Sequence, residues 1–96
     1  MQKLSNLPGW PPEGGAGPFD TRKTAFSTSP ELVKFRRVDR IVGKRVDMTC
    51  MFAQEVVTFR YFAANAGMAE NVAKVLGQYE GKSLLDLGKL MVEDSE

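Results

Sequence analysis

The sequence predicts a small α+β domain in which one main helix covers an antiparallel sheet of three to four strands. Two observations lead to this fold class. Apolar side chains alternate with a period of two in residues 46–52, and from residue 65 onward they recur at helical spacing. The chain has 96 residues, which is close to the usual size of one domain. A partly open barrel is the alternative arrangement for the same short strands.

The first thirty residues form a proline- and glycine-rich arm. The stretch NLPGWPPEGGAGPFD (6–20) holds four prolines and four glycines, which disfavour helices and central strands. It also contains Leu7, Trp10 and Phe19, which are unusual in a free linker. We therefore divide the chain into an arm, 1–30, docked on a single α+β domain, 31–96. A disordered leader is the alternative.

Three strands are predicted between residues 32 and 62. Residues 32–42 are rich in β-branched side chains but alternate imperfectly, as a bent or bulged strand does. Gly43-Lys44 is a tight turn, and residues 46–52 then alternate cleanly. After a second turn at 53–55, residues 56–62 carry apolar side chains on both faces. This pattern is typical of a central strand, or of one partly covered by the arm.

The main helix is predicted to begin after Asn65 as N-cap, with Glu70 in its first turn and Gly81 as the residue that ends it. Its apolar face is formed by Met68, Val72, Val75, Leu76 and Tyr79. The sequence Ser83-Leu84-Leu85-Asp86 then resembles a small capping box, and Gly88 ends the helical turn that it begins. Residues 89–93 are predicted as a last short strand.

The stretch GQYEGKS (77–83) resembles a phosphate-binding loop, but its glycines are one residue too close together. It also follows a helix instead of a strand. We interpret it as a helix end, in which Lys82 lies near the C-terminal dipole.

Catalytic chemistry has little support in the composition. The chain has no histidine and a single cysteine, so a triad of the usual kind is excluded. Cys50 lies in an apolar alternation and is expected to be a buried thiol with a raised pKa. The carboxylates have no metal-ligand spacing, and we predict no enzyme activity, no metal and no cofactor. Two carboxylates that meet only in the folded chain are the catalytic alternative left open.

The sequence contains no secretory leader and no apolar run near the roughly 18 residues that a membrane span requires. Together with the lone cysteine, these features predict a reduced, cytoplasmic protein.

Charge is unevenly distributed along the chain. Residues 1–33 are neutral, residues 34–45 carry a net charge of +5 and residues 46–96 one of −4. The candidate nucleic-acid contacts of the basic band are Lys34, Arg36, Arg37, Arg40, Lys44 and Arg45. Regular strand alternation would divide them between two faces. A solvated edge strand protected by charge is the simpler interpretation.

Three functions remain as hypotheses. The leading one is a non-enzymatic binding protein that self-associates, with a dimer favoured, because a short chain has a thin core and its charged segments are complementary. The second is a nucleic-acid-binding accessory protein that uses the band 34–45. The third is a small-ligand carrier whose pocket or interface residues are Trp10, Phe59, Tyr61 and Tyr79. Core packing explains the same aromatic residues without a ligand.

Four stretches resemble a loose group of short bacterial proteins, some of them carried on mobile integron gene cassettes. They are LPGWPP (7–12), GPFD (17–20), TFRYFAAN (58–65) and GKSLLDLG (81–88). The resemblance implies a soluble bacterial accessory protein and assigns no site residues.

Overall fold

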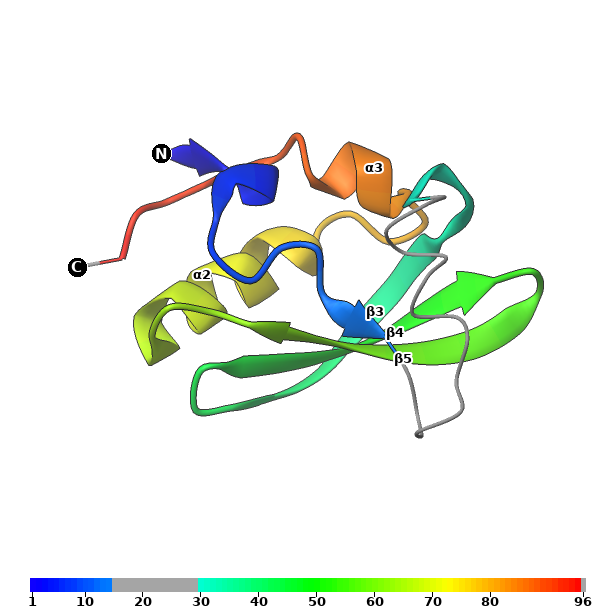
Figure 1. Cartoon of the computed structure of the whole chain (residues 1–96), viewed down its shortest axis with the longest axis horizontal. Helices are drawn as coiled ribbons and strands as arrows, with labels where there is room; N and C mark the ends of the chain where they lie inside the picture. The colour runs from blue at the N-terminus through cyan, green and yellow to red at the C-terminus, as the bar shows by residue number, and fades with distance from the viewer. Residues whose placement is uncertain (15–29, 96) are drawn as a thin grey trace.

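Two antiparallel sheets and two α-helices make up the part of the chain that the structure, a computed structural model, describes: residues 1–14 and 30–95 (Figure 1). The main sheet has the strand order β2-β5-β4-β3, and a two-stranded sheet pairs β1 with β6. The strands are β1 (Gln2–Lys3), β2 (Glu13–Gly14), β3 (Lys34–Val42), β4 (Arg45–Phe52), β5 (Glu55–Phe62) and β6 (Met91–Val92). The helices are α2 (Ala66–Leu76) and α3 (Leu84–Leu87), with short 3-10 turns η1 (Leu4–Asn6) and η2 (Pro30–Leu32). The predicted α+β class is confirmed, and the main sheet is not closed into a barrel.

Two tight turns join the three long strands. In the first turn Gly43 has a φ of 61°, which glycine adopts without strain. In the second turn Ala53 and Gln54 have φ values of 52° and 66°. Positive φ at both central residues is the requirement of a type I′ hairpin turn, although neither residue is one that favours it.

Strand β3 is bulged, as its imperfect alternation predicts. Its register against β4 shifts between Phe35 and Arg37, and again between Val38 and Arg40. At each shift one residue of β3, Arg36 or Asp39, has no partner on β4. The side chains that follow it therefore point to the face opposite the one that regular alternation would give them.

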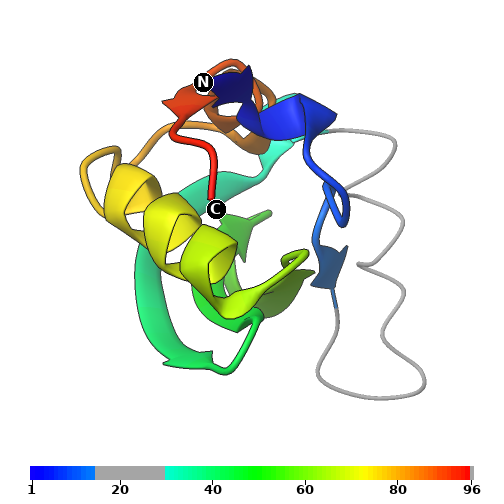
Figure 2. The ribbon, with the colours of Figure 1, turned by 90° about the vertical axis from the view of Figure 1, so that its left-hand side faces the viewer.

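The core lies between one face of the main sheet and α2, which crosses β3 and β4 (Figure 2). The strands contribute Val46, Met48, Cys50, Val57, Phe59 and Tyr61, and the helix contributes Met68, Val72 and Leu76; all nine are buried. These are the apolar faces that the periodicity of two and the helical spacing predict.

Helix α2 begins where the sequence predicts and ends earlier. The Asn65 side-chain oxygen accepts a hydrogen bond of 2.8 Å from the Met68 backbone N–H, which confirms the N-cap. The helix ends at Leu76, with Gly77 as its C-cap, so the assignment of Gly81 as the helix end was wrong. Glu70 is the fifth helical residue and therefore lies outside the first turn, where we expected it.

Residues 81–84 pair with the beginning of β3. Gly81 N–H donates to the Phe35 carbonyl at 2.8 Å, and Phe35 N–H donates to the Lys82 carbonyl at 2.9 Å. Leu84 N–H donates to the Val33 carbonyl at 2.9 Å. The backbone of this stretch therefore extends the sheet and does not form a phosphate cradle. Ser83 then caps α3 by accepting from the Asp86 N–H at 3.2 Å, as its capping box predicts.

The N-terminal segment lies against the C-terminal one. Strand β1 pairs with β6, and Leu4 N–H donates to the Leu90 carbonyl at 2.8 Å. The last predicted strand therefore joins β1, and the fourth strand of the main sheet is β2. Leu4 and Leu7 are buried in the core.

Close contacts continue beyond Leu7. Gly9 has a φ of 92°, and a side chain there would collide with the Phe62 carbonyl oxygen. The Tyr61 hydroxyl donates to the Pro8 carbonyl at 3.1 Å. Phe19, which we expected to dock on the domain together with the rest of the arm, lies outside the described residues.

Candidate nucleic-acid interface

The main sheet has an outer face on the side opposite α2. Alternation along β4 places Arg45, Asp47, Thr49 and Met51 on this face, since Val46, Met48 and Cys50 point into the core. Phe62, Arg60, Thr58 and Val56 of β5 are their cross-strand partners in that order.

The two bulges of β3 bring basic side chains together on the outer face. Lys34 pairs with Met51, Arg37 with Thr49 and Arg40 with Asp47. A regular strand would place residues three apart on opposite faces, and each bulge corrects that spacing by one residue. The separation of Lys34 and Arg40 from Arg37 that regular alternation predicts is therefore wrong.

Two members of the predicted basic band lie elsewhere. Arg36 is the residue inserted at the first bulge, and its Nε lies 4.0 Å from a carboxylate oxygen of Glu80 in the loop after α2. Lys44 lies in the first turn and is exposed, and its carbonyl accepts a hydrogen bond of 2.8 Å from Ala63 N–H.

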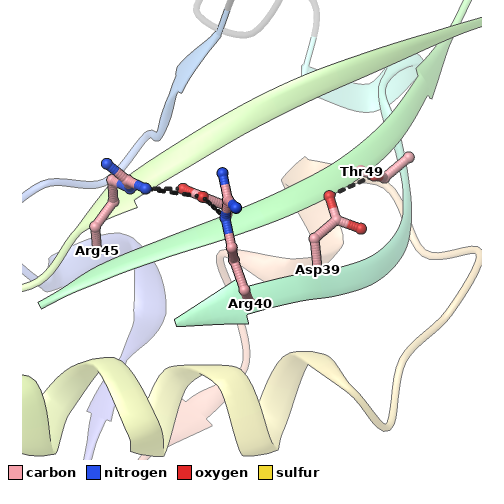
Figure 3. A network of polar contacts seen from close by, with 5 residues as sticks. Asp39, Arg40, Arg45 and Thr49 are labelled. Atoms are coloured by element: carbon pink, nitrogen blue, oxygen red, sulfur yellow. Dashed lines mark hydrogen bonds and ion pairs between the residues drawn. The ribbon is translucent and has the colours of Figure 1, made fainter. Parts of the chain in front are cut away.

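Asp47 is the centre of a charged network on the outer face (Figure 3). Its two carboxylate oxygens accept hydrogen bonds of 2.8 Å from the Nε atoms of Arg40 and Arg45, and a second Arg45 nitrogen donates at 3.1 Å. The Asp47 side chain is 6% exposed, whereas that of Arg40 is 68% exposed. The arginines therefore cover the carboxylate and themselves stay in contact with water.

Burial works against ionisation of Asp47, but the hydrogen bonds and positive charges of Arg40 and Arg45 prevail and hold its pKa below the usual value. The hydrogen bond and the charge of Asp47 in turn raise the pKa of Arg40. Asp47 and Arg40 therefore remain a charged pair at neutral pH.

A second carboxylate orients Arg37. Its Nε donates to one oxygen of Asp39 at 3.1 Å. The other Asp39 oxygen accepts from the Thr49 hydroxyl at 2.7 Å (Figure 3). Asp39 is thus fixed by Thr49 and in turn fixes Arg37.

Arg60 also belongs to the outer face, although the sequence analysis did not single it out. It is the cross-strand partner of Asp47 on β5 and is exposed. Its position could have been predicted, since Arg60 stands between the apolar residues Phe59 and Tyr61 and so points to the opposite face of the strand. Among the described side chains of the outer face, the charged ones are Lys34, Arg37, Arg40, Arg45 and Arg60 against Asp39 and Asp47, a net charge of +3.

The four candidate aromatic residues do not form one pocket. Phe59 and Tyr61 are fully buried, and Tyr79 packs against the core after the end of α2. Trp10 is half-buried, with its ring centroid 6.0 Å from that of Tyr61 and the rings inclined by 58°.

Trp10 lines a different pocket, with a volume of about 670 Å³. The other lining residues in the described part of the chain are Ser5, Pro11, Pro30, Leu84, Leu85, Gly88 and Lys89.

Cys50 is buried as predicted, and burial, aided by the negative charge of Asp39, raises its pKa to about 12. Within residues 1–14 and 30–95, no group of three or more Cys, Asp or Glu side chains is arranged to hold a metal ion. None of the described helices is long and apolar enough to cross a membrane.

Comparison with known proteins finds no matching family model, no matching curated protein and no matching solved structure. The resemblance to short cassette-encoded bacterial proteins therefore stays a prediction.

Proposed function

We propose that this chain is a non-enzymatic binding protein whose outer sheet face binds the phosphate backbone of a nucleic acid. The observation that carries the proposal is the bulged register of β3, which brings Lys34, Arg37 and Arg40 onto one face beside Arg45 and Arg60. The bacterial cytoplasmic setting and the lack of catalytic activity stay predictions from the sequence.

The hydrogen bonds of the outer face suit this role. Asp39 and Asp47 accept from the Nε atoms of Arg37 and Arg40, so in these contacts the terminal guanidinium nitrogens remain available. Terminal nitrogens are the donors with which arginine binds phosphate in a bidentate manner. The carboxylates therefore preorganise the two arginines at a smaller conformational-entropy penalty on binding.

The exposure of these side chains supports the same role. Arg37 and Arg40 are 65% and 68% exposed, and ion pairs at such positions contribute only about 0–1 kcal/mol to stability. Among the described side chains of the outer face, five basic ones stand against the two carboxylates Asp39 and Asp47. An excess of positive charge on an open face favours contact with a polyanion.

The test is the affinity for fluorescein-labelled oligonucleotides, single-stranded and duplex, measured by fluorescence anisotropy at several salt concentrations. Three to four phosphate contacts predict a slope of log affinity against log salt of about −2 to −3 for single strands. The double variant Lys34→Glu/Arg37→Glu is expected to lower the affinity at least about tenfold and to reduce the slope.

The matched control is Lys74→Glu/Lys82→Glu, which changes the net charge equally at exposed positions off the outer face. An equal loss of affinity in the control would assign the effect to net charge and reject this interface. Binding that does not depend on salt would also reject it.

We also propose self-association, with a dimer favoured, because two exposed apolar side chains flank Arg45 on the outer face at the end of the main sheet beside Gly43. Val42 ends β3 and Phe62 ends β5 two strands away, and Arg45 is the register partner of both. Sedimentation velocity from ten to several hundred micromolar tests this. A concentration-independent monomer would contradict it, and Phe62→Ser is expected to weaken any dimer.

A further inference from the structure

The pocket beside Trp10 lies between the N-terminal segment and α3, away from the outer sheet face. In both ribbon views η1 lies next to α3 (Figures 1 and 2). Ser5 N–H donates to the Gly88 carbonyl at 2.9 Å, so backbone hydrogen bonding joins two walls of the pocket directly. This hydrogen bond fixes the N-terminal segment beside α3 at the pocket.

The lining is apolar apart from two groups. Trp10, Pro11, Pro30, Leu84 and Leu85 contribute rings and aliphatic side chains, and the polar side chains are those of Ser5 and Lys89. Among the lining residues within 1–14 and 30–95, Lys89 is the charged one and none is a carboxylate. A ligand that complements this pocket has an apolar body and one negative charge.

The aromatic wall of the pocket packs against the core. The Tyr61 ring centroid lies 6.0 Å from that of Trp10, and the Tyr61 hydroxyl donates a hydrogen bond to the Pro8 carbonyl. The indole of Trp10 therefore offers a flat apolar surface against which a planar ring can pack. The volume of about 670 Å³ lies within the roughly 300–1,000 Å³ that is usual for small-molecule sites.

We propose that this pocket binds a small aromatic carboxylate, with its ring against Trp10 and the two prolines and its carboxylate toward the Lys89 ammonium group. The site is separate from the nucleic-acid interface, since none of its described lining residues lies on the outer sheet face.

The experiment titrates ¹⁵N-labelled full-length protein with naphthalene-2-carboxylate. Trp10 is the single tryptophan of the sequence, so its indole N–H gives one resolved reporter signal inside the pocket. A saturable shift of this signal is expected, together with shifts of the Ser5, Leu85 and Gly88 amides. The neutral analogue naphthalene-2-carboxamide is expected to bind about three- to tenfold more weakly, because it forms no ion pair with Lys89.

Two variants change the pocket at exposed side chains. Lys89→Glu is expected to weaken carboxylate binding about three- to tenfold, and Leu85→Glu at least about tenfold, since a charge would replace an apolar wall. Lys82→Glu is the charge-matched control outside the pocket and is expected to leave binding unchanged. Lys34→Glu/Arg37→Glu is also expected to bind the carboxylate normally, which separates this site from the proposed nucleic-acid face.

Three results would overturn the assignment. The first is an indole signal that does not move at millimolar carboxylate. The second is equal affinity for the carboxylate and the carboxamide. The third is an indole shift that follows protein concentration alone, because the occupant would then be a second copy of this chain.

Discussion

The side chains on the two faces of the main sheet make different kinds of contact, although they project from the same strand, β4. On the inner face of β4, Val46, Met48 and Cys50 are fully buried by apolar packing. On the outer face Asp47 and Thr49 are 4% and 5% exposed, and Arg40, Arg45 and Asp39 bond to them. Burial on the inner face drives folding, whereas the outer face depends on hydrogen bonds to the covered carboxylate of Asp47, whose partner Arg40 stays exposed. The exposed arginine can therefore contact a partner without opening the core.

The largest expected contrast is between two phenylalanines of β5. Phe59 is fully buried on the inner face, and Phe62 is 41% exposed on the outer face. Phe59→Ala is expected to lower the free energy of unfolding by about 3–5 kcal/mol, because it leaves a cavity in the core. Phe62→Ala is the control and is expected to lower it by less than about 1 kcal/mol. Urea denaturation measures both, and similar losses would contradict the separation of the two faces.

The outer face is tested next by Asp47→Asn. The amide retains the size of the side chain but removes the charge that accepts from Arg40 and Arg45. A loss of about 1–3 kcal/mol at pH 7 is expected, because hydrogen bonds to charged groups are lost at a covered position. Asp86→Asn, at an exposed carboxylate, is the control. No loss in Asp47→Asn would mean that the network adds nothing to stability.

The same variant predicts a pH dependence. The folded pKa of Asp47 lies below its ordinary value of 3.8, so its stabilising contribution is present above that value and is lost as the pH falls through the folded pKa. The difference in stability between wild type and Asp47→Asn should therefore be constant from about pH 5 to 8 and shrink below about pH 4. Asp94, whose pKa is also lowered, is present in both proteins and cancels in the difference. A gap that stays constant down to pH 2 would contradict the pKa direction.

The smallest expected effect concerns the turn between β4 and β5, which joins the two strands that contribute side chains to both faces. Ala53 and Gln54 both adopt positive φ, a conformation that Asn and Gly accept more readily. Ala53→Asn/Gln54→Gly is therefore expected to raise the free energy of unfolding by about 1 kcal/mol. Thermal denaturation measures the gain. Gly43 has a positive φ in the other turn, so Gly43→Ala is expected to lower the free energy of unfolding.

The sequence predicted the residues of the inner face better than those of the outer face, because side-chain periodicity marks the residues that are buried. The core residues Val46, Phe59 and Val72 could be identified in this way. The caps Asn65 and Ser83 could be identified from their residue types and positions. The end of α2 was misplaced because Gly77 and Gly81 are both able to stop a helix, and tertiary pairing of Gly81 with Phe35 decides between them.

The candidate sites depend on contacts that no local pattern encodes. The positions of the two bulges in β3 follow from its pairing with β4, so the gathering of Lys34, Arg37 and Arg40 could not be read from spacing. Arg60 was missed because it lies outside the contiguous basic band. The pocket joins residues 5–11 to residues 84–89, which meet because β1 pairs with β6 across most of the chain.

The bulges of β3 have a consequence for the behaviour of concentrated solutions. Fibrils grow when identical segments stack in register as flat strands. The two bulges interrupt the row of backbone hydrogen-bonding groups along β3, so a second copy of the strand cannot pair with it along its whole length. Stacking copies in register would also place like charges next to one another. Removing the bulges by deleting Arg36 and Asp39 should flatten this segment, and we expect the shortened protein to form thioflavin-positive aggregates at concentrations where the parent chain remains clear.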